Sequence, residues 1–118
     1  MFLELNHTKL KVYKHSRRFV VESYKMANAL PSDEKFAMMQ QIKRAALSVH
    51  LNIAEGSSRK SGVERKRFYE ISRGSIIEVD AAIDIADDLN YLENYDTSAL
   101  GIEMIEVFKL VSGLINAE

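Results

Sequence analysis

Four stretches of the chain repeat apolar residues at intervals of three and four, and three short polar breaks separate these stretches. Such intervals follow the 3.6-residue turn of an α-helix, so each stretch predicts a helix with one apolar face. The predicted helices span residues 8–30, 33–56, 62–92 and 97–116. With 5 glycines and 1 proline, the chain also has too few turn residues for an all-β protein. The sequence therefore predicts an all-α protein.

The helix ends and the inward faces are predicted from individual residues. Gly56 is expected to end the second helix in a left-handed conformation. The predicted N-terminal caps are Thr8, Ser32, Thr97 and Ser61, the last forming a capping box with Glu64. The predicted core-facing residues are Leu10, Tyr13, Arg17, Val20, Val21, Tyr24 and Ala27 or Ala29, then Phe36, Met39, Ile42, Ala46, Val49 and Ile53. In the last two helices they are Phe68, Ile71, Ser75, Val79, Ala82, Ile83, Ala86 and Leu89, then Leu100, Met104, Val107, Phe108, Val111, Leu114 and Ile115.

The breaks between the predicted helices are short, and short connections make consecutive helices antiparallel neighbours. The expected fold is an antiparallel up-down-up-down four-helix bundle. At 118 residues the chain has the length of one domain, which we expect to cover residues 1–118. This topology brings the start of the first helix, the second connection and the end of the fourth helix to one end of the bundle.

The charges of the chain are strongly segregated. Residues 1–73 hold 15 Lys and Arg against 7 Asp and Glu, a net charge of +8. Residues 74–118 hold 1 lysine against 10 acidic residues, a net charge of −9, so the whole chain carries −1. Such an asymmetry indicates an interaction surface. The topology gathers bases at one end of the bundle and acids at the other.

The basic end predicts a nucleic-acid interface. Helix dipoles favour acids in the first turn and bases in the last, yet the third helix begins with Arg65, Lys66 and Arg67 and ends with Asp84, Asp87 and Asp88. Helix formation does not explain this order of charges, whereas binding to a phosphate backbone requires a cluster of cations. The predicted contact residues are Lys11, Lys14, Arg17, Arg18, Arg59, Lys60, Arg65, Lys66 and Arg67, with Lys9 beside them. Binding is expected to be sequence-independent and sensitive to salt.

A second polar feature follows the second and third helices. Arg44, Asn52, Glu55 and Glu78 are predicted to form a hydrogen-bond network that fixes the register of these helices, with Arg44 reaching Glu78. Gly74 lies in the middle of the third helix, where glycine lowers helix stability unless it permits a close approach of another helix.

The segments "QIKRAALSVHLNIAEGSSR", "FYEISRGSIIEVD" and "DDLNYL" resemble a bacterial family of four-helix-bundle proteins encoded in intervening sequences of large-subunit ribosomal RNA genes, sometimes labelled ribosomal proteins. The densest motif is Asn52-Ile53-Ala54-Glu55-Gly56. The chain departs from the family pattern at Tyr13, where such proteins often have Trp, and at His50, where many have Pro. The resemblance implies a homopentamer, and its relatives include an accessory protein of diversity-generating retroelements that binds a reverse transcriptase and nucleic acid partners.

Other signals are absent from the sequence. The chain has no cysteine, no apolar run of about 20 residues and no basic leader, which together predict a cytoplasmic protein without a membrane span. No metal, cofactor or catalytic motif is expected. Three functions therefore remain open: a non-enzymatic oligomeric RNA-binding scaffold, an adaptor for an acidic partner protein such as a nucleic-acid-processing enzyme, and a HEPN-like ribonuclease. The last would use Arg44 and His50, which a helical period places on different faces.

Overall fold

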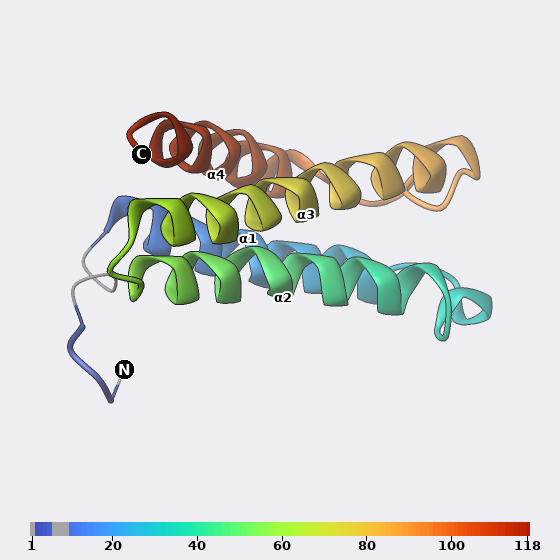
Figure 1. The fold of residues 1–118 in the computed structure, drawn as a ribbon. Coiled ribbons are helices and arrows are strands. Elements are labelled where there is room, and N and C mark those ends of the chain that lie inside the picture. The colour runs from blue at the N-terminus through green and yellow to red at the C-terminus, as the bar shows by residue number, and fades with distance from the viewer. Residues whose placement is uncertain (1, 6–9) are drawn as a thin grey trace.

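The computed structural model describes residues 2–5 and 10–118 of the chain, and every regular element within them is a helix. The helices are α1 (Lys11–Asn28), a short 3-10 turn η2 (Ser32–Glu34), α2 (Met38–Ser57), α3 (Gly62–Asp88) and α4 (Ser98–Asn116). Figure 1 shows the four long helices running antiparallel to their neighbours along the chain. The predicted all-α four-helix bundle is confirmed.

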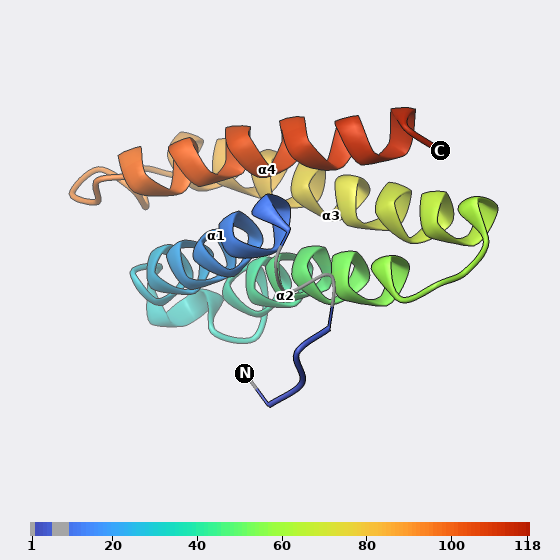
Figure 2. The ribbon, with the colours of Figure 1, turned by 90° about the vertical axis from the view of Figure 1, so that its left-hand side faces the viewer.

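The helices occupy the four corners of the bundle. α1 packs on α2 and α4, and α3 packs on the same two helices, so α1 and α3 lie at opposite corners. We call the end where residues 58–61 join α2 to α3 the turn end. Figure 2 shows that α2 ends, α3 begins and α4 ends there, and α1 begins at the same end in Figure 1.

The core-facing side of α1 differs from the predicted one. Val12, Phe19 and Met26 are buried at intervals of seven, and Ser16 and Ser23 are buried between them. Arg17 and Val21, both predicted to face the core, are exposed. The prediction was wrong because the inward positions between the large apolar residues hold serines, which break the apolar pattern without preventing burial.

The start of α2 also differs. Ser32 begins the η2 turn rather than α2, and the helix begins six residues later at Met38. Phe36 therefore lies in the connection, where 81% of its surface is exposed, and the prediction that it faces the core was wrong. Ile71 and Leu89 of the predicted α3 stripe are about half exposed too.

The other predicted helix ends are partly confirmed. Ser61 caps α3, because its hydroxyl accepts a hydrogen bond from the backbone N–H of Glu64. At α4 the cap differs: the Asp96 carboxylate accepts from the backbone N–H of Ser98 at 2.9 Å, whereas Thr97 makes no such bond. The predicted cap Thr8 lies outside the described residues.

Gly56 does not have the predicted left-handed conformation. It is buried within the last turns of α2, and Ser58 follows the helix in a right-handed conformation. A Cβ built on Gly56 would lie 2.9 Å from Cβ of Phe68 and 2.9 Å from Cε1 of Tyr69. The glycine is therefore needed because the backbone of α2 touches side chains of α3.

A left-handed residue does end α3. Asn90 has a φ of 61°, and the N–H of Tyr91 donates to the carbonyl of Ala86 at 2.9 Å. The N–H of Asn90 donates to the carbonyl of Asp87, which completes a Schellman motif. This motif stops the helix at Asp88, four residues before the predicted end.

Candidate nucleic-acid interface

The predicted contact residues form two groups, one at the second connection and one on α1. The turn group consists of Arg59, Lys60, Arg65, Lys66 and Arg67, and the helix-1 group consists of Lys11, Lys14, Arg17 and Arg18. Since α1 and α3 lie at opposite corners, α2 and α4 separate the helix-1 group from the α3 members of the turn group. Both groups nevertheless lie toward the turn end, the end at which the sequence predicts the bases to gather. Lys9 lies outside the described residues.

Arg65 is a structural member of the turn group. Its Nη1 donates to the backbone carbonyls of Arg59 at 3.1 Å and Lys60 at 2.8 Å, which closes the connection onto α3. Its Nε and Nη2 donate to the two carboxylate oxygens of Glu118 at 2.6 and 3.0 Å. This bidentate hydrogen bond lowers the pKa of Glu118 and raises that of Arg65. Arg65 is therefore already neutralised within the molecule.

Arg59 is also engaged inside the molecule. Its guanidinium forms an ion pair with Glu55, one helical turn earlier, and lies 5.0 Å from the centre of the Phe68 ring. This contact pins the end of α2 against α3.

Three cations of the turn group are available to a ligand. Lys60, Lys66 and Arg67 are exposed and form no ion pair with any described residue. They belong to the connection and to the first turn and a half of α3, where the positive end of the helix dipole adds to their charge. These three cations and the helix N-terminus carry the same sign of charge, and Glu64 is the acidic residue of the first turn.

The helix-1 group is half neutralised by α4. Lys11 lies 3.7 Å from Glu106, and Arg18 lies 3.9 Å from Glu103. The carboxylate of Glu103 is also 2.7 Å from Nδ1 of His15. Lys14 and Arg17 are exposed and have no carboxylate partner within the described chain.

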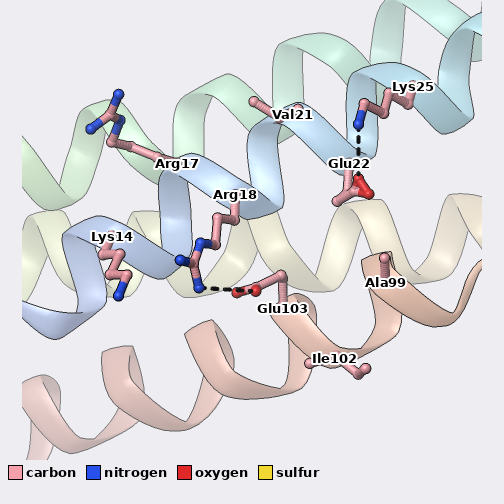
Figure 3. A pocket seen from close by; sticks show the side chains of 9 residues that line it. All are labelled: Lys14, Arg17, Arg18, Val21, Glu22, Lys25, Ala99, Ile102 and Glu103. Carbon is pink, nitrogen blue, oxygen red and sulfur yellow. Dashed lines mark ion pairs between the residues drawn. The ribbon is translucent and has the colours of Figure 1, made fainter.

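A groove runs between α1 and α4 beside the helix-1 group. It has a volume of about 740 Å³, and Val21 and Ile102 contribute exposed apolar surface to it. Figure 3 shows Lys14, Arg17, Arg18 and Lys25 along its α1 side. Sequence reasoning found the cations but missed the groove, because the α4 residues that complete it are distant in the chain.

The predicted polar network forms with different members. Asn52 donates to the carbonyl and the hydroxyl of Ser48 at 2.8 and 3.0 Å, and Ser75 of α3 donates to the same hydroxyl at 3.0 Å. Ser72 donates to the carbonyl of Val49 at 2.9 Å. Small hydroxyls thus join α2 to α3.

The charged members of that prediction lie elsewhere. Arg44 and Glu78 are exposed and form no ion pair with each other, and Glu55 pairs with Arg59. The expected Arg44 to Glu78 contact was therefore wrong. Gly74 is exposed with nothing within 4 Å of a built Cβ, so no helix of the same protomer approaches it.

The structure does not bring Arg44 and His50 together. Arg44 lines a shallow groove with Phe36, Gln41 and Ile85, between α2 and α3. His50 faces α1 instead, where its Nδ1 lies 2.7 Å from the hydroxyl of Ser16 and its ring is 4.6 Å from that of Tyr13. The histidine joins α1 to α2.

Among residues 2–5 and 10–118, no cluster of His, Asp and Glu has the arrangement of a metal site. None of the described helices is both long enough and apolar enough to cross a membrane.

Comparison with known proteins places the chain in a family. No curated protein matches it. The model of one family, described as 23S rRNA-intervening sequence protein, matches residues 8–113, which include all four long helices up to the last turn of α4. A match over this much of the chain shows that the protein belongs to the 23S rRNA-intervening sequence protein family.

Proposed function

We propose that this protein is a non-enzymatic, oligomeric RNA-binding protein that holds a phosphate backbone with the free cations of its turn group. The observation that carries the proposal is the state of Lys60, Lys66 and Arg67, which are exposed and have no ion pair with the rest of the described chain. Unpaired cations at the N-terminus of a helix destabilise that helix unless an anion is present. A phosphate backbone supplies such an anion.

The family description connects these proteins with an intervening sequence of 23S rRNA, which makes RNA the first polyanion to test. Two aromatic rings lie near the turn group: Arg59 already covers that of Phe68, and Tyr69 is buried. Few aromatic rings are therefore accessible for stacking on bases, and binding should depend on charge rather than on base sequence.

Self-association is part of the proposal. Large apolar side chains are exposed along α3 and α4, among them Ile77, Ile102, Ile105 and Phe108. Association would cover such side chains. A homopentamer, the assembly that the resemblance implies, would repeat the turn group five times and strengthen the binding of one RNA chain through multivalency.

The test compares two double variants with the same change of charge. Lys60→Glu with Lys66→Glu should weaken binding of a labelled single-stranded RNA of mixed sequence about tenfold or more at fixed salt. The slope of log K against log salt should fall by about 0.7 for each lost phosphate contact. The control is Lys35→Glu with Lys109→Glu, two exposed lysines outside both basic groups, which should bind almost as the wild type does. Arg65 is left unchanged because it holds the connection.

Equal binding by the two double variants would contradict the proposal. The adaptor function would then be tested by capture of partners after exhaustive nuclease digestion. A protein retained by the wild type after digestion and lost from the Lys60 and Lys66 variant would assign the turn group to an acidic protein instead of RNA.

A further inference from the structure

The groove between α1 and α4 combines apolar surface with cations. Val21 is 52% exposed and Ile102 is 67% exposed, which is costly for large apolar side chains in water. Lys14, Arg17, Arg18 and Lys25 surround them, against two carboxylates, Glu22 and Glu103. Lys14 and Arg17 lack an ion pair within the described chain. The groove therefore suits an occupant that presents both apolar and acidic side chains.

The chain itself carries such a surface on α3. Its outer side holds two small or apolar residues and three aspartates at intervals of three and four, which we call the acidic stripe: Ile77, Asp80, Ala81, Asp84 and Asp88. All five are exposed, and Ile77 is 52% exposed. The aspartates form no ion pair with any other described residue. The carboxylates of the stripe are therefore unpaired within the part of the protomer that the structure describes.

The acidic stripe and the α1 side of the groove both present side chains at helical intervals. Asp80, Asp84 and Asp88 recur every four residues, about 6 Å apart along the helix axis. On α1, Lys14 and Arg18 have the same separation, and Val21 and Lys25 continue the row at intervals of three and four. A helix that lies along the groove could thus bring carboxylates of the stripe to Lys14 and Arg17, the cations without an ion pair, while Ile77 covers exposed apolar surface of the groove.

We propose that the α1–α4 groove of one copy binds the acidic stripe of a second copy, an inference that rests on the self-association included in the proposed function. A protomer cannot make this contact with itself, because α1 and α3 lie at opposite corners of the bundle. The contact is heterologous: each copy offers one groove and one stripe, so repetition gives a ring when the rotation closes. The helix-1 group then serves assembly, and the turn group remains free for RNA.

The variants that test the contact are expected to fold. Lys14 lies near the start of α1 and Asp88 at the end of α3, so Lys14→Glu and Asp88→Lys both improve the match with the helix dipole. Arg17 and Asp84 are exposed and unpaired within the described chain. Far-UV circular dichroism and thermal unfolding of each variant check this expectation.

The experiment measures mass in solution by light scattering after gel filtration. The groove variant (Lys14→Glu with Arg17→Glu) and the stripe variant (Asp84→Lys with Asp88→Lys) should each be monomeric, whereas Lys35→Glu with Lys109→Glu should keep the wild-type mass. Mixing the two monomeric variants should restore assembly, because the intact stripe of one fits the intact groove of the other and the two reversed surfaces also attract each other. Combining all four substitutions in one chain should restore larger assemblies through the reversed charges.

The outcomes separate this inference from the proposed function. If the wild type is oligomeric and the groove and stripe variants have the same mass as the wild type, the inference is overturned and self-association remains supported. Two monomeric variants that fail to associate when mixed would overturn it as well, since the groove would then bind something other than the stripe. A wild type that is monomeric at high concentration would overturn the oligomer itself. RNA binding is measured separately with the Lys60 and Lys66 variant, whose mass should equal that of the wild type.

Discussion

Gly56 of α2 lies against Tyr69 of α3 so closely that a built Cβ would be 2.9 Å from the ring carbon Cε1. Gly56→Ala should therefore lower the free energy of unfolding by about 1–2 kcal/mol, because overpacking outweighs the gain of about 1 kcal/mol in helix propensity. Gly74→Ala is the matched control, since nothing lies within 4 Å of its built Cβ. It should raise stability by up to about 1 kcal/mol. Urea unfolding measures both, and a stabilising Gly56→Ala would contradict the close approach.

Two phenylalanines, one buried and one exposed, test the corrected core. Phe19 is fully buried in α1, whereas Phe36 is 81% exposed in the connection before α2. Phe19→Ala should cost about 3–5 kcal/mol of stability, and Phe36→Ala should change it by less than about 0.5 kcal/mol. Both are measured by chemical unfolding. Similar losses for the two variants would restore the original prediction that Phe36 faces the core.

The hydrogen bonds between Arg65 and Glu118 should make stability depend on pH. They lower the pKa of Glu118 from its ordinary value of 4.5, so the unfolded chain takes up this proton at a higher pH than the folded chain does. The stabilisation is therefore present above about pH 4.5 and is lost as the pH falls through the folded pKa. The stability difference between the wild type and Glu118→Gln should shrink over that window. A difference that stays constant from neutral to acidic pH would show that the pair is not formed.

The left-handed turn after α3 gives a prediction about Asn90. Its φ of 61° suits glycine at least as well as asparagine, whereas alanine is strained there. Asn90→Ala should cost about 1 kcal/mol, and Asn90→Gly should cost only a few tenths or stabilise slightly. Thermal unfolding of the two variants provides the comparison. An alanine variant as stable as the glycine variant would argue against the Schellman motif.

The helical period in the sequence was sufficient to predict the number of helices and their antiparallel order. The Ser61 cap was also predictable, because a capping box is a local pattern. The core-facing side of α1 was harder to assign, because Ser16 and Ser23 are buried although a search for apolar residues does not count serines as core positions. Gly56 shows a related limit. A glycine near a helix end predicts a left-handed residue, and only the position of Tyr69 reveals that it serves a close approach instead.

The candidate site was predicted residue by residue rather than as a surface. Arg65 could not be distinguished from Lys66 in the sequence, because its partner Glu118 lies 53 residues away. The same holds for Lys11 and Arg18, which α4 neutralises through Glu106 and Glu103. Counts of charge along a chain thus overestimate the cations available to a ligand.

The proposed RNA-binding surface lies at the start of α3 and shares no side chain with the α1–α4 groove or with the acidic stripe farther along α3. The free energies of subunit association and of RNA binding should then be independent at the level of one protomer, and substitutions in the two groups should combine additively. Any coupling measured between Lys14 and Lys66 would have to arise from the number of turn groups that one RNA chain meets in the assembly. Geometry of this kind allows affinity to be tuned through subunit number while the contact of each protomer stays the same.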